Sequence, residues 1–208
     1  GVRAVTIPGV RITAVVVDDG SGDNTAAVAA EAGAVVLSHP HNRGVGAGFR
    51  TGLDYALSRN ADLLVHMDSD GQVLPVEIPL LVSPVLSGEA DLALGCRFLG
   101  TRPDNLDAWK AMALQSMAQV VGLLTGYRLH DLSCGFRCMN RRIMESVRPT
   151  FDYDYIQETL IQALAHHARV VEIPVTVLYE REPARKGMSG RVLRYGQRFM
   201  ALTGYSLL

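Results

Sequence analysis

Two carboxylates and an amide follow an apolar run in the stretch Leu63-Leu64-Val65-His66-Met67-Asp68-Ser69-Asp70-Gly71-Gln72. The apolar run predicts a buried strand, and Asp68 and Asp70 come where that strand ends. Open α/β sheets bind ligands in the crevice at the carboxyl ends of their strands. Hard oxygen ligands gathered there suit Mg²⁺ or Mn²⁺ held against a diphosphate. The stretch therefore suggests nucleoside-diphosphate chemistry.

Strand and helix patterns alternate along the first half of the chain. Apolar runs predict strands at 12–17, 34–37, 63–67, 92–94 and 170–178. Apolar residues at helical spacing predict helices at 24–32, 45–58, 76–86, 108–124, 154–167 and 192–202. This order predicts an α/β fold in which a mostly parallel central sheet is flanked by helices, with a more helical second half.

Length and charge limit the classes of function. The 208 residues, 48% of them hydrophobic, suit one domain with a substantial core. Twenty basic and twenty-one acidic side chains give a formal charge of −1, so nothing in the balance indicates a nucleic-acid partner. The sequence leaves the oligomeric state open.

The cysteines and the hydropathy pattern indicate a compartment. Cys96, Cys134 and Cys138 form an odd set without the spacing of a disulfide framework, which fits a reducing environment and buried thiols. A zinc site is disfavoured because no histidine pair completes it. No apolar run approaches the ~18 residues that a membrane span needs, and no signal pattern is present. We expect a cytoplasmic protein, at most peripheral to the inner face of the membrane.

A second acidic motif follows the first predicted strand, in Val15-Val16-Val17-Asp18-Asp19-Gly20-Ser21. One of its carboxylates could accept a hydrogen bond from a nucleotide base or a ribose hydroxyl at the strand end. The alternative is that both aspartates only shape the turn before the next helix, which Asp23 or Asn24 is suited to cap.

Three further motifs are ambiguous one by one. Asn42-Arg43-Gly44-Val45-Gly46-Ala47-Gly48 opens a helix, where glycines allow close backbone approach and the N-terminus favours anions, but it lacks the spacing of a dinucleotide fingerprint. Arg97 follows a short strand, and its guanidinium suits phosphate. A polar turn, His130-Asp131-Leu132-Ser133-Cys134-Gly135-Phe136-Arg137, adds a carboxylate, a hydroxyl and an arginine.

Taken in order, these motifs resemble the inverting family 2 glycosyltransferases, and within them the dolichyl-phosphate mannosyltransferases and related polyprenyl-phosphate glycosyltransferases. The resemblance runs from Val15 to Arg198 and includes Glu172-Ile173-Pro174-Val175 and Gly187-Met188-Ser189. It implies one glycosyltransferase A-type, Rossmann-like catalytic domain over residues 1–208, with a nucleotide-binding half at about 10–100 and an acceptor half at about 101–208.

The resemblance also implies a site. The nucleoside of a nucleoside-diphosphate sugar would contact Asp18, Asp19, Ser21, Arg43 and Asp68. Mg²⁺ or Mn²⁺ would be held by Asp68, Asp70 and Gln72. The catalytic residues would be Asp131, Arg97 and Arg137, and the acceptor or its phosphate would contact Ser133, Arg185, Lys186 and Ser189.

The implied reaction is transfer of a sugar, with inversion, to an acceptor, which the resemblance suggests is a polyprenyl phosphate. A phosphate is already ionised and needs no general base, whereas a hydroxyl of a small molecule or glycan would need one, for which Asp131 is the candidate. Two other classes compete. A receiver domain would need a lysine after a late strand, and Lys110 and Lys186 are not so placed. A non-catalytic nucleotide-sugar-binding module would not need complete metal and acceptor motifs.

The two ends of the chain carry separate expectations. The basic segment from Arg181 to Arg191, with Arg194 and Arg198, would close over the diphosphate and meet an anionic membrane surface, unless it is a solvated helix face. The family's first strand, which ends in a Pro-x-x-Asn-Glu element, is absent, and Gly1 to Pro8 resembles the end of the helix that follows it. We expect the native product to extend upstream through that strand.

Overall fold

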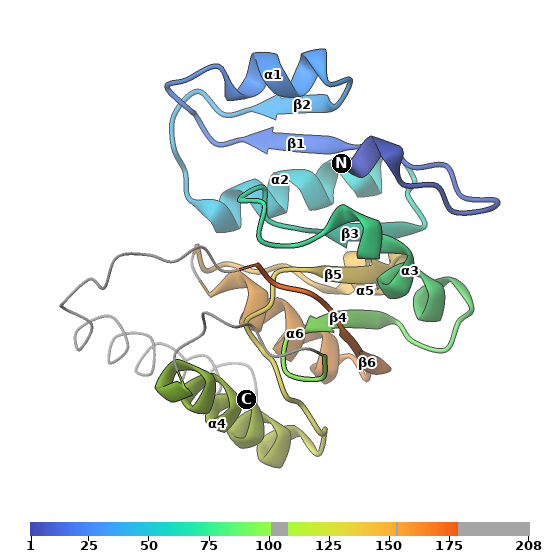
Figure 1. The fold of residues 1–208 in the computed structure, drawn as a ribbon, viewed down its shortest axis with the longest axis vertical. Coiled ribbons are helices and arrows are strands. Elements are labelled where there is room, and N and C mark those ends of the chain that lie inside the picture. The colour runs from blue at the N-terminus through green and yellow to red at the C-terminus, as the bar shows by residue number, and fades with distance from the viewer. Residues whose placement is uncertain (101–107, 153, 179–208) are drawn as a thin grey trace.

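The structure, a computed structural model, describes residues 1–100, 108–152 and 154–178 (Figure 1). Its strands are β1 (Val15–Asp18), β2 (Val35–Ser38), β3 (Leu63–His66), β4 (Leu92–Cys96), β5 (Arg137–Asn140) and β6 (Val170–Pro174). Its α-helices are α1 (Thr25–Glu31), α2 (Val45–Ser58), α3 (Ile78–Leu86), α4 (Ala108–Thr125), α5 (Arg141–Ser146) and α6 (Tyr155–Ala165). Two 3₁₀ helices, η1 (Val2–Ala4) and η2 (Pro75–Glu77), complete the described elements. The strands and helices predicted within these residues are present, α2 at its predicted bounds and the others with shifted ends. The helix predicted at 192–202 lies outside them.

The described strands form two sheets. β1 and β2 pair in parallel, and the second sheet has the order β3-β5-β4-β6. In that sheet β4 and β6 are parallel, but β5 runs antiparallel to both β3 and β4. The α/β class is confirmed, and β5 is an antiparallel insertion that the sequence analysis did not predict.

Strand β5 and helix α5 were missed because their residues carry little apolar periodicity. Arg137 and Asn140 are the first and last residues of a strand of four residues, and from the sequence alone Arg137 reads as the end of a polar turn. Pairing with β3 and β4 buries this strand despite its polar ends. Asn140 then caps α5, because its side chain accepts a hydrogen bond from the backbone N–H of Ile143 at 3.0 Å.

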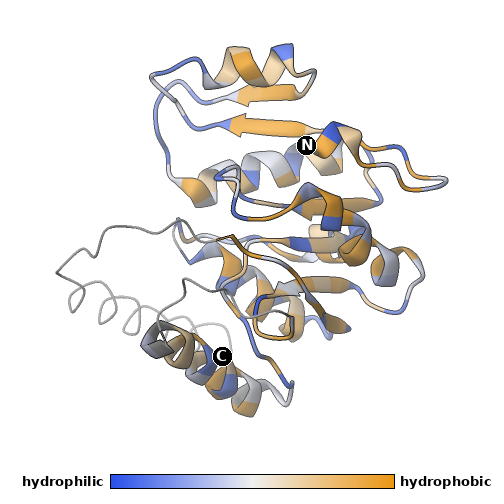
Figure 2. Ribbon diagram, viewed as in Figure 1, coloured by the Kyte–Doolittle hydropathy of each residue, from blue (hydrophilic) through white to orange (hydrophobic). Residues whose placement is uncertain are grey.

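The core lies on both faces of the larger sheet, as alternating strand side chains require. Leu92 and Leu94 of β4 pack on the face covered by α2, α4, α5 and α6, and Ala93 packs on the face covered by α3. Figure 2 shows the strands as hydrophobic bands with hydrophilic loops at their ends. Full burial of a leucine side chain contributes about 1.5–3 kcal/mol, so this interior dominates stability.

The three cysteines are buried free thiols, as predicted. Burial raises the pKa of Cys96 and of Cys138 to about 12, which keeps both thiols protonated and unreactive near neutral pH.

In the described part of the chain β1 does not pair with β3, so no backbone hydrogen bonds join the two sheets there. Helix α2 instead contacts both sheets. A Cβ atom built on Gly52 would lie 3.5 Å from a methyl group of Val17 in β1. On the other side, Leu53 belongs to the core cluster that contains Leu92. The helix therefore holds the smaller sheet against the larger one.

Residues 2–4, in the segment predicted to resemble a helix end, form η1.

Arg137, which the resemblance implies is a catalytic residue, makes buried structural contacts in this fold. It is 2% exposed and donates to the carbonyl oxygens of Cys134 at 2.9 Å, Leu132 at 2.7 Å and Ile156 at 2.6 Å. A guanidinium supplies enough donors for all of these acceptors at once. It thereby ties the turn before β5 to the start of α6.

Replacing Arg137 with methionine keeps the apolar stem but leaves those carbonyls without their donor. We expect Arg137→Met to lower the free energy of unfolding by about 2–4 kcal/mol, measured by urea denaturation. Arg3→Met, which removes an exposed hydrogen bond to the carbonyl of Ala32, should cost much less. A variant at 137 as stable as the wild type, but with slower sugar transfer, would instead support the catalytic role that the resemblance implies.

Asp91 lies at the other end of the larger sheet from the turn before β5, directly before the first residue of β4. It is 4% exposed, and a cluster of polar side chains surrounds it. Arg169 donates to its carboxylate from Nε and Nη2, both at 3.0 Å, and Arg142 lies 2.8 Å from Oδ2. Asn140 adds a hydrogen bond of 2.9 Å. The Arg169 guanidinium holds the pKa of Asp91 well below its ordinary value.

Because the pKa of Asp91 is lower in the folded than in the unfolded protein, its contribution is complete above the unfolded pKa of about 3.9. It is lost as the pH falls from there toward the folded pKa. We expect Asp91→Asn to lower the melting temperature at pH 7, and the difference from the wild type to shrink below about pH 4. Thermal denaturation between pH 7 and pH 2 tests this, and a difference independent of pH contradicts it.

Candidate active site

The predicted motifs meet at one edge of the fold because β5 is antiparallel. Arg137, its first residue, pairs in register with His66 at the end of β3 and with Leu94 near the end of β4. The turn at 130–136 is thereby brought to the carboxyl ends of the neighbouring strands. Figure 1 shows the arrows of β1, β2 and β4 pointing to the same side.

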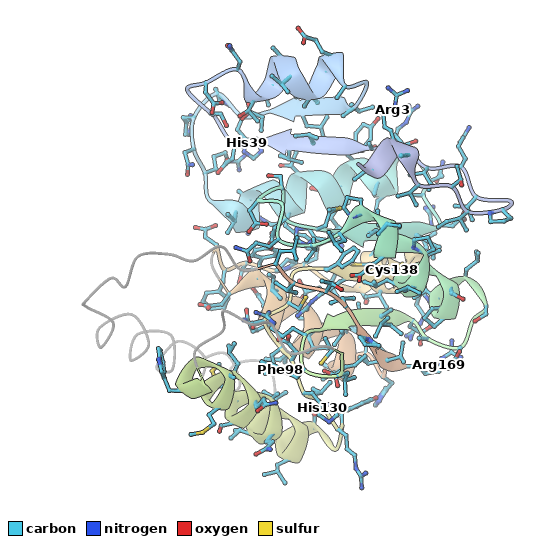
Figure 3. The ribbon with its side chains drawn as sticks, viewed as in Figure 1. Arg3, His39, Phe98, His130, Cys138 and Arg169 are labelled. Carbon is cyan, nitrogen blue, oxygen red and sulfur yellow. The ribbon has the colours of Figure 1, made fainter. Side chains whose placement is uncertain are left out.

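Asp19 organises the loop after β2. Its carboxylate accepts hydrogen bonds from the backbone N–H groups of Arg43 at 2.9 Å and Gly44 at 2.7 Å, and its Oδ1 lies 2.6 Å from Nδ1 of His39. Burial opposes the charge of Asp19, but these hydrogen bonds outweigh it and lower the pKa of the carboxyl. Figure 3 shows His39 beside the carboxyl end of β1.

His39 is a residue that sequence reasoning missed. It is 9% exposed, and its second nitrogen, Nε2, lies 2.8 Å from the hydroxyl of Thr51 in α2. Its partners are 12 and 20 residues away in the chain, so no local pattern in the sequence indicates its role.

The other predicted nucleoside contacts lie at the same end of β1. Asp18 is buried and accepts a hydrogen bond of 3.1 Å from the backbone N–H of Ser21. Ser21 and Arg43 are exposed, so their side chains are available to a ligand.

The glycine motif serves close packing in this structure. A Cβ atom on Gly46 would lie 2.8 Å from Cα of Asp152, and the N–H of Gly46 donates to the carbonyl of Asp152 at 2.9 Å. A Cβ atom on Gly20 would similarly collide with the backbone of His41. These contacts give Gly46 and Gly20 a structural role that needs no bound ligand.

The predicted metal ligands come from the loop after β3. Asp68 and Asp70 are exposed, and Asp70 accepts a hydrogen bond of 3.0 Å from the backbone N–H of Gln72. A Cβ atom on Gly135 would lie 2.6 Å from Oδ2 of Asp68, so the Asp68 carboxylate lies directly against the turn before β5.

These residues fit a divalent cation shared with a substrate rather than a site made by protein alone. Within the described ranges, no three His, Cys, Asp or Glu side chains gather as a metal-binding group. Mg²⁺ typically keeps several waters and binds one or two carboxylates together with substrate phosphates. Two exposed aspartates at a strand end match that requirement.

Arg97 and Asp131 form a buried ion pair at the end of β4. Nε of Arg97 lies 2.6 Å from Oδ2 of Asp131, whose side chain is fully buried. Ser133 joins the pair, because its backbone N–H and its hydroxyl donate to Oδ1 of Asp131 at 3.0 and 3.2 Å, and Nη2 of Arg97 reaches its Oγ at 3.2 Å. The structure therefore brings together three predicted site residues. It buries Asp131, the candidate base, instead of presenting it to an acceptor.

Glu172 in β6 is a second residue without a role in the sequence analysis. Its carboxylate accepts from the backbone N–H groups of His130 and Asp131, each at 2.9 Å, and lies 2.6 Å from Nδ1 of His130. It fixes the start of the turn that carries Asp131 (His130 is labelled in Figure 3). Arg185, Lys186 and Ser189, with the basic segment around them, lie outside the described residues.

Three curated relatives of the chain have names that refer to polyprenol, undecaprenyl phosphate or dolichyl phosphate. This chain is 31% identical over 195 residues to a polyprenol monophosphomannose synthase of Mycolicibacterium smegmatis, and the match covers 88% of this chain and 73% of the relative. It is 28% identical over 195 residues to an undecaprenyl-phosphate mannosyltransferase of Micrococcus luteus, covering 91% and 78%. A dolichyl-phosphate N-acetylglucosaminyltransferase of Methanococcus voltae that uses UDP-N-acetylglucosamine is 25% identical over 194 residues, covering 83% and 77%.

Solved structures agree on the fold. Glucosyl-3-phosphoglycerate synthase of Mycobacterium tuberculosis, in complex with Mn²⁺, UDP and glucosyl-3-phosphoglycerate, superposes with a TM-score of 0.71 at 18% identity. The match covers 96% of this chain and 70% of the synthase, and it confirms the predicted glycosyltransferase A-type fold. The family model for glycosyl transferase family 2 matches residues 3–148, which is more than half of the sequence. The chain belongs to that family and is a glycosyltransferase.

Proposed function

We propose that this glycosyltransferase moves a sugar, with inversion, from a nucleoside-diphosphate sugar to a polyprenyl phosphate with the help of Mg²⁺ or Mn²⁺. An oxygen of the acceptor phosphate attacks the anomeric carbon from the face opposite the donor diphosphate. The bond from that carbon to the diphosphate breaks, and the nucleoside diphosphate leaves with the electron pair. No proton needs to move.

The burial of Asp131 carries the assignment of the acceptor. A hydroxyl acceptor would require a general base within hydrogen-bond reach, whereas an ionised phosphate requires none. Asp131 is 0% exposed and is engaged by Arg97 and Ser133. The names of the relatives, which refer to polyprenol, undecaprenyl and dolichyl phosphates, support the same acceptor class.

Exposed and buried side chains would divide the work at the donor. Asp68, Asp70 and Gln72 would hold the cation through their side-chain oxygens. A bound divalent cation supplies Lewis-acid stabilisation of the charge that builds on the leaving diphosphate. Asp18, Ser21 and Arg43 would contact the nucleoside, a role supported by the exposure of Ser21 and Arg43. Asp19 orients the backbone that carries Arg43.

Helix α4 offers an apolar surface for the lipid. Trp109, Met112, Val120 and Leu123 are 39%, 67%, 42% and 86% exposed, and their spacing places them on one helix face. The helix lies in the chain between Arg97 and the turn at 130–136. This face would contact the isoprenoid chain or the bilayer surface around it. None of the helices in the described ranges has the length and apolar character needed to cross a membrane.

Asp70→Asn tests the metal assignment. Because Asp70 is exposed, we expect this variant to keep the melting temperature of the wild type while losing sugar transfer by more than about 100-fold. Excess chelator should do the same to the wild type. Asp54→Asn, an equivalent change on an exposed position of α2, serves as the control. Full turnover in excess chelator would contradict the use of a metal.

A matched pair of acceptors tests the nucleophile. We expect transfer to a polyprenyl phosphate and none to the polyprenol with the same chain, measured with radiolabelled donor and extraction of the lipid product. Lengthening the chain should lower the KM for the phosphate, because more apolar surface is buried. Efficient transfer to the alcohol would instead indicate that Asp131 rearranges to act as a base.

A further inference from the structure

His66 joins the two halves of the candidate site. It is the last residue of β3, two positions before Asp68, and its Nδ1 lies 2.7 Å from the carbonyl oxygen of Gly135. A carbonyl oxygen only accepts, so Nδ1 carries the proton and donates it to this hydrogen bond. The ring thereby holds the turn before β5 against the strand that leads to Asp68.

The ring is itself fixed by packing. Phe49 and Tyr155 meet it edge-on, with ring centroids 5.2 and 5.7 Å away. The hydroxyl of Tyr155 lies 3.4 Å from Nε2, the nitrogen that accepts in this tautomer. Because the ring has little freedom to rotate, it can hold the residues that it contacts at fixed positions.

Gly135 is the point at which the two motifs touch. Its carbonyl is bound by His66, and its Cα borders the Asp68 carboxylate so closely that a Cβ atom would lie 2.6 Å from Oδ2. The neighbouring carbonyls of Cys134 and Phe136 are bound by Arg137 at 2.9 Å and by the N–H of Gly95 at 2.8 Å. Three consecutive carbonyls of the turn therefore accept hydrogen bonds from residues of β3, β4 and β5.

We propose that His66 is a positioning residue that, through Gly135, sets the distance between Asp68 and the turn carrying Asp131 and Ser133. This role of His66 rests on the proposed function, which supplies the identity of the donor and the acceptor. The imidazole acts on the geometry of both partners and touches neither donor nor acceptor. Misplacement of groups by about 1 Å can cost 100-fold in rate, so loss of this hydrogen bond should matter for turnover more than for stability.

The test compares variants with and without a donor at the Nδ1 position. In His66→Asn the amide nitrogen takes the place of Nδ1, whereas His66→Gln carries its amide one bond further out and His66→Leu has none. We expect His66→Leu and His66→Gln to lower kcat by about 10- to 100-fold and to weaken Mn²⁺-dependent binding of UDP or GDP in calorimetry. His66→Asn should stay within about threefold of the wild type, because one hydrogen bond donor is restored.

Two further variants separate positioning from loss of stability. Arg169→Ala destabilises the remote Asp91 cluster and should leave nucleotide binding unchanged. Gly135→Ala pushes on Asp68 from the other side and should weaken Mn²⁺-dependent nucleotide binding even with His66 intact. Hydrogen exchange at residues 131–136, measured without ligand, should rise in His66→Leu and return toward wild type in His66→Asn.

The outcomes distinguish the two proposals. His66→Leu with wild-type kinetics, or His66→Asn as impaired as His66→Leu, would overturn the role of the hydrogen bond. If the wild type shows no metal-dependent nucleotide binding, the proposed function fails. Unchanged exchange at 131–136 in His66→Leu would then still overturn the role of His66 independently.

Discussion

The candidate site depends on the hydrogen bonds by which Arg137 holds the turn before β5. A strand inserted antiparallel between β3 and β4 must be entered by a chain that crosses the carboxyl edge of the sheet, where carbonyls would otherwise lack donors. The Arg137 guanidinium satisfies those of Leu132 and Cys134. The turn can therefore be both buried and polar, and it brings Asp131 and Ser133 to the ends of β3 and β4.

The parts of the fold that the sequence predicts are those with local signals. Strands such as β1 and β3 are apolar runs ended by aspartates, and α2 repeats its apolar positions at helical spacing, so their periodicity is visible without any partner. β5 becomes a strand only by pairing with residues more than 40 positions away, and nothing in its own four residues indicates that. The structural contacts of Arg137 could not be predicted for the same reason, because the carbonyl of Ile156 that it reaches lies 19 residues along the chain.

Exposure divides aspartates that look alike in the sequence. Asp19, Asp68 and Asp131 each lie near a strand end, and any of them could be interpreted as a ligand. The carboxylate of Asp19 is instead hydrogen-bonded to two backbone N–H groups and to His39. The carboxylate of Asp131 accepts hydrogen bonds from a backbone N–H group and from Arg97. Asp68, like Asp70 beside it, is exposed. The carboxylates that organise the site are thus different from those available to a cation, and only their surroundings reveal which is which.

The Arg97–Asp131 pair is better explained by the site than by stability. Removing two charges from water costs several kcal/mol per ion, and well-packed apolar residues in the same volume would often be at least as stable. Asp131 is nevertheless fully buried, while the Arg97 side chain keeps 11% exposure at the edge where the motifs meet. With its Nε bound by Asp131 and its Nη2 directed to Ser133, the guanidinium is already oriented when the chain folds. An anionic group arriving there would meet a cation whose conformational freedom is already lost, so its binding would carry less of that entropic cost.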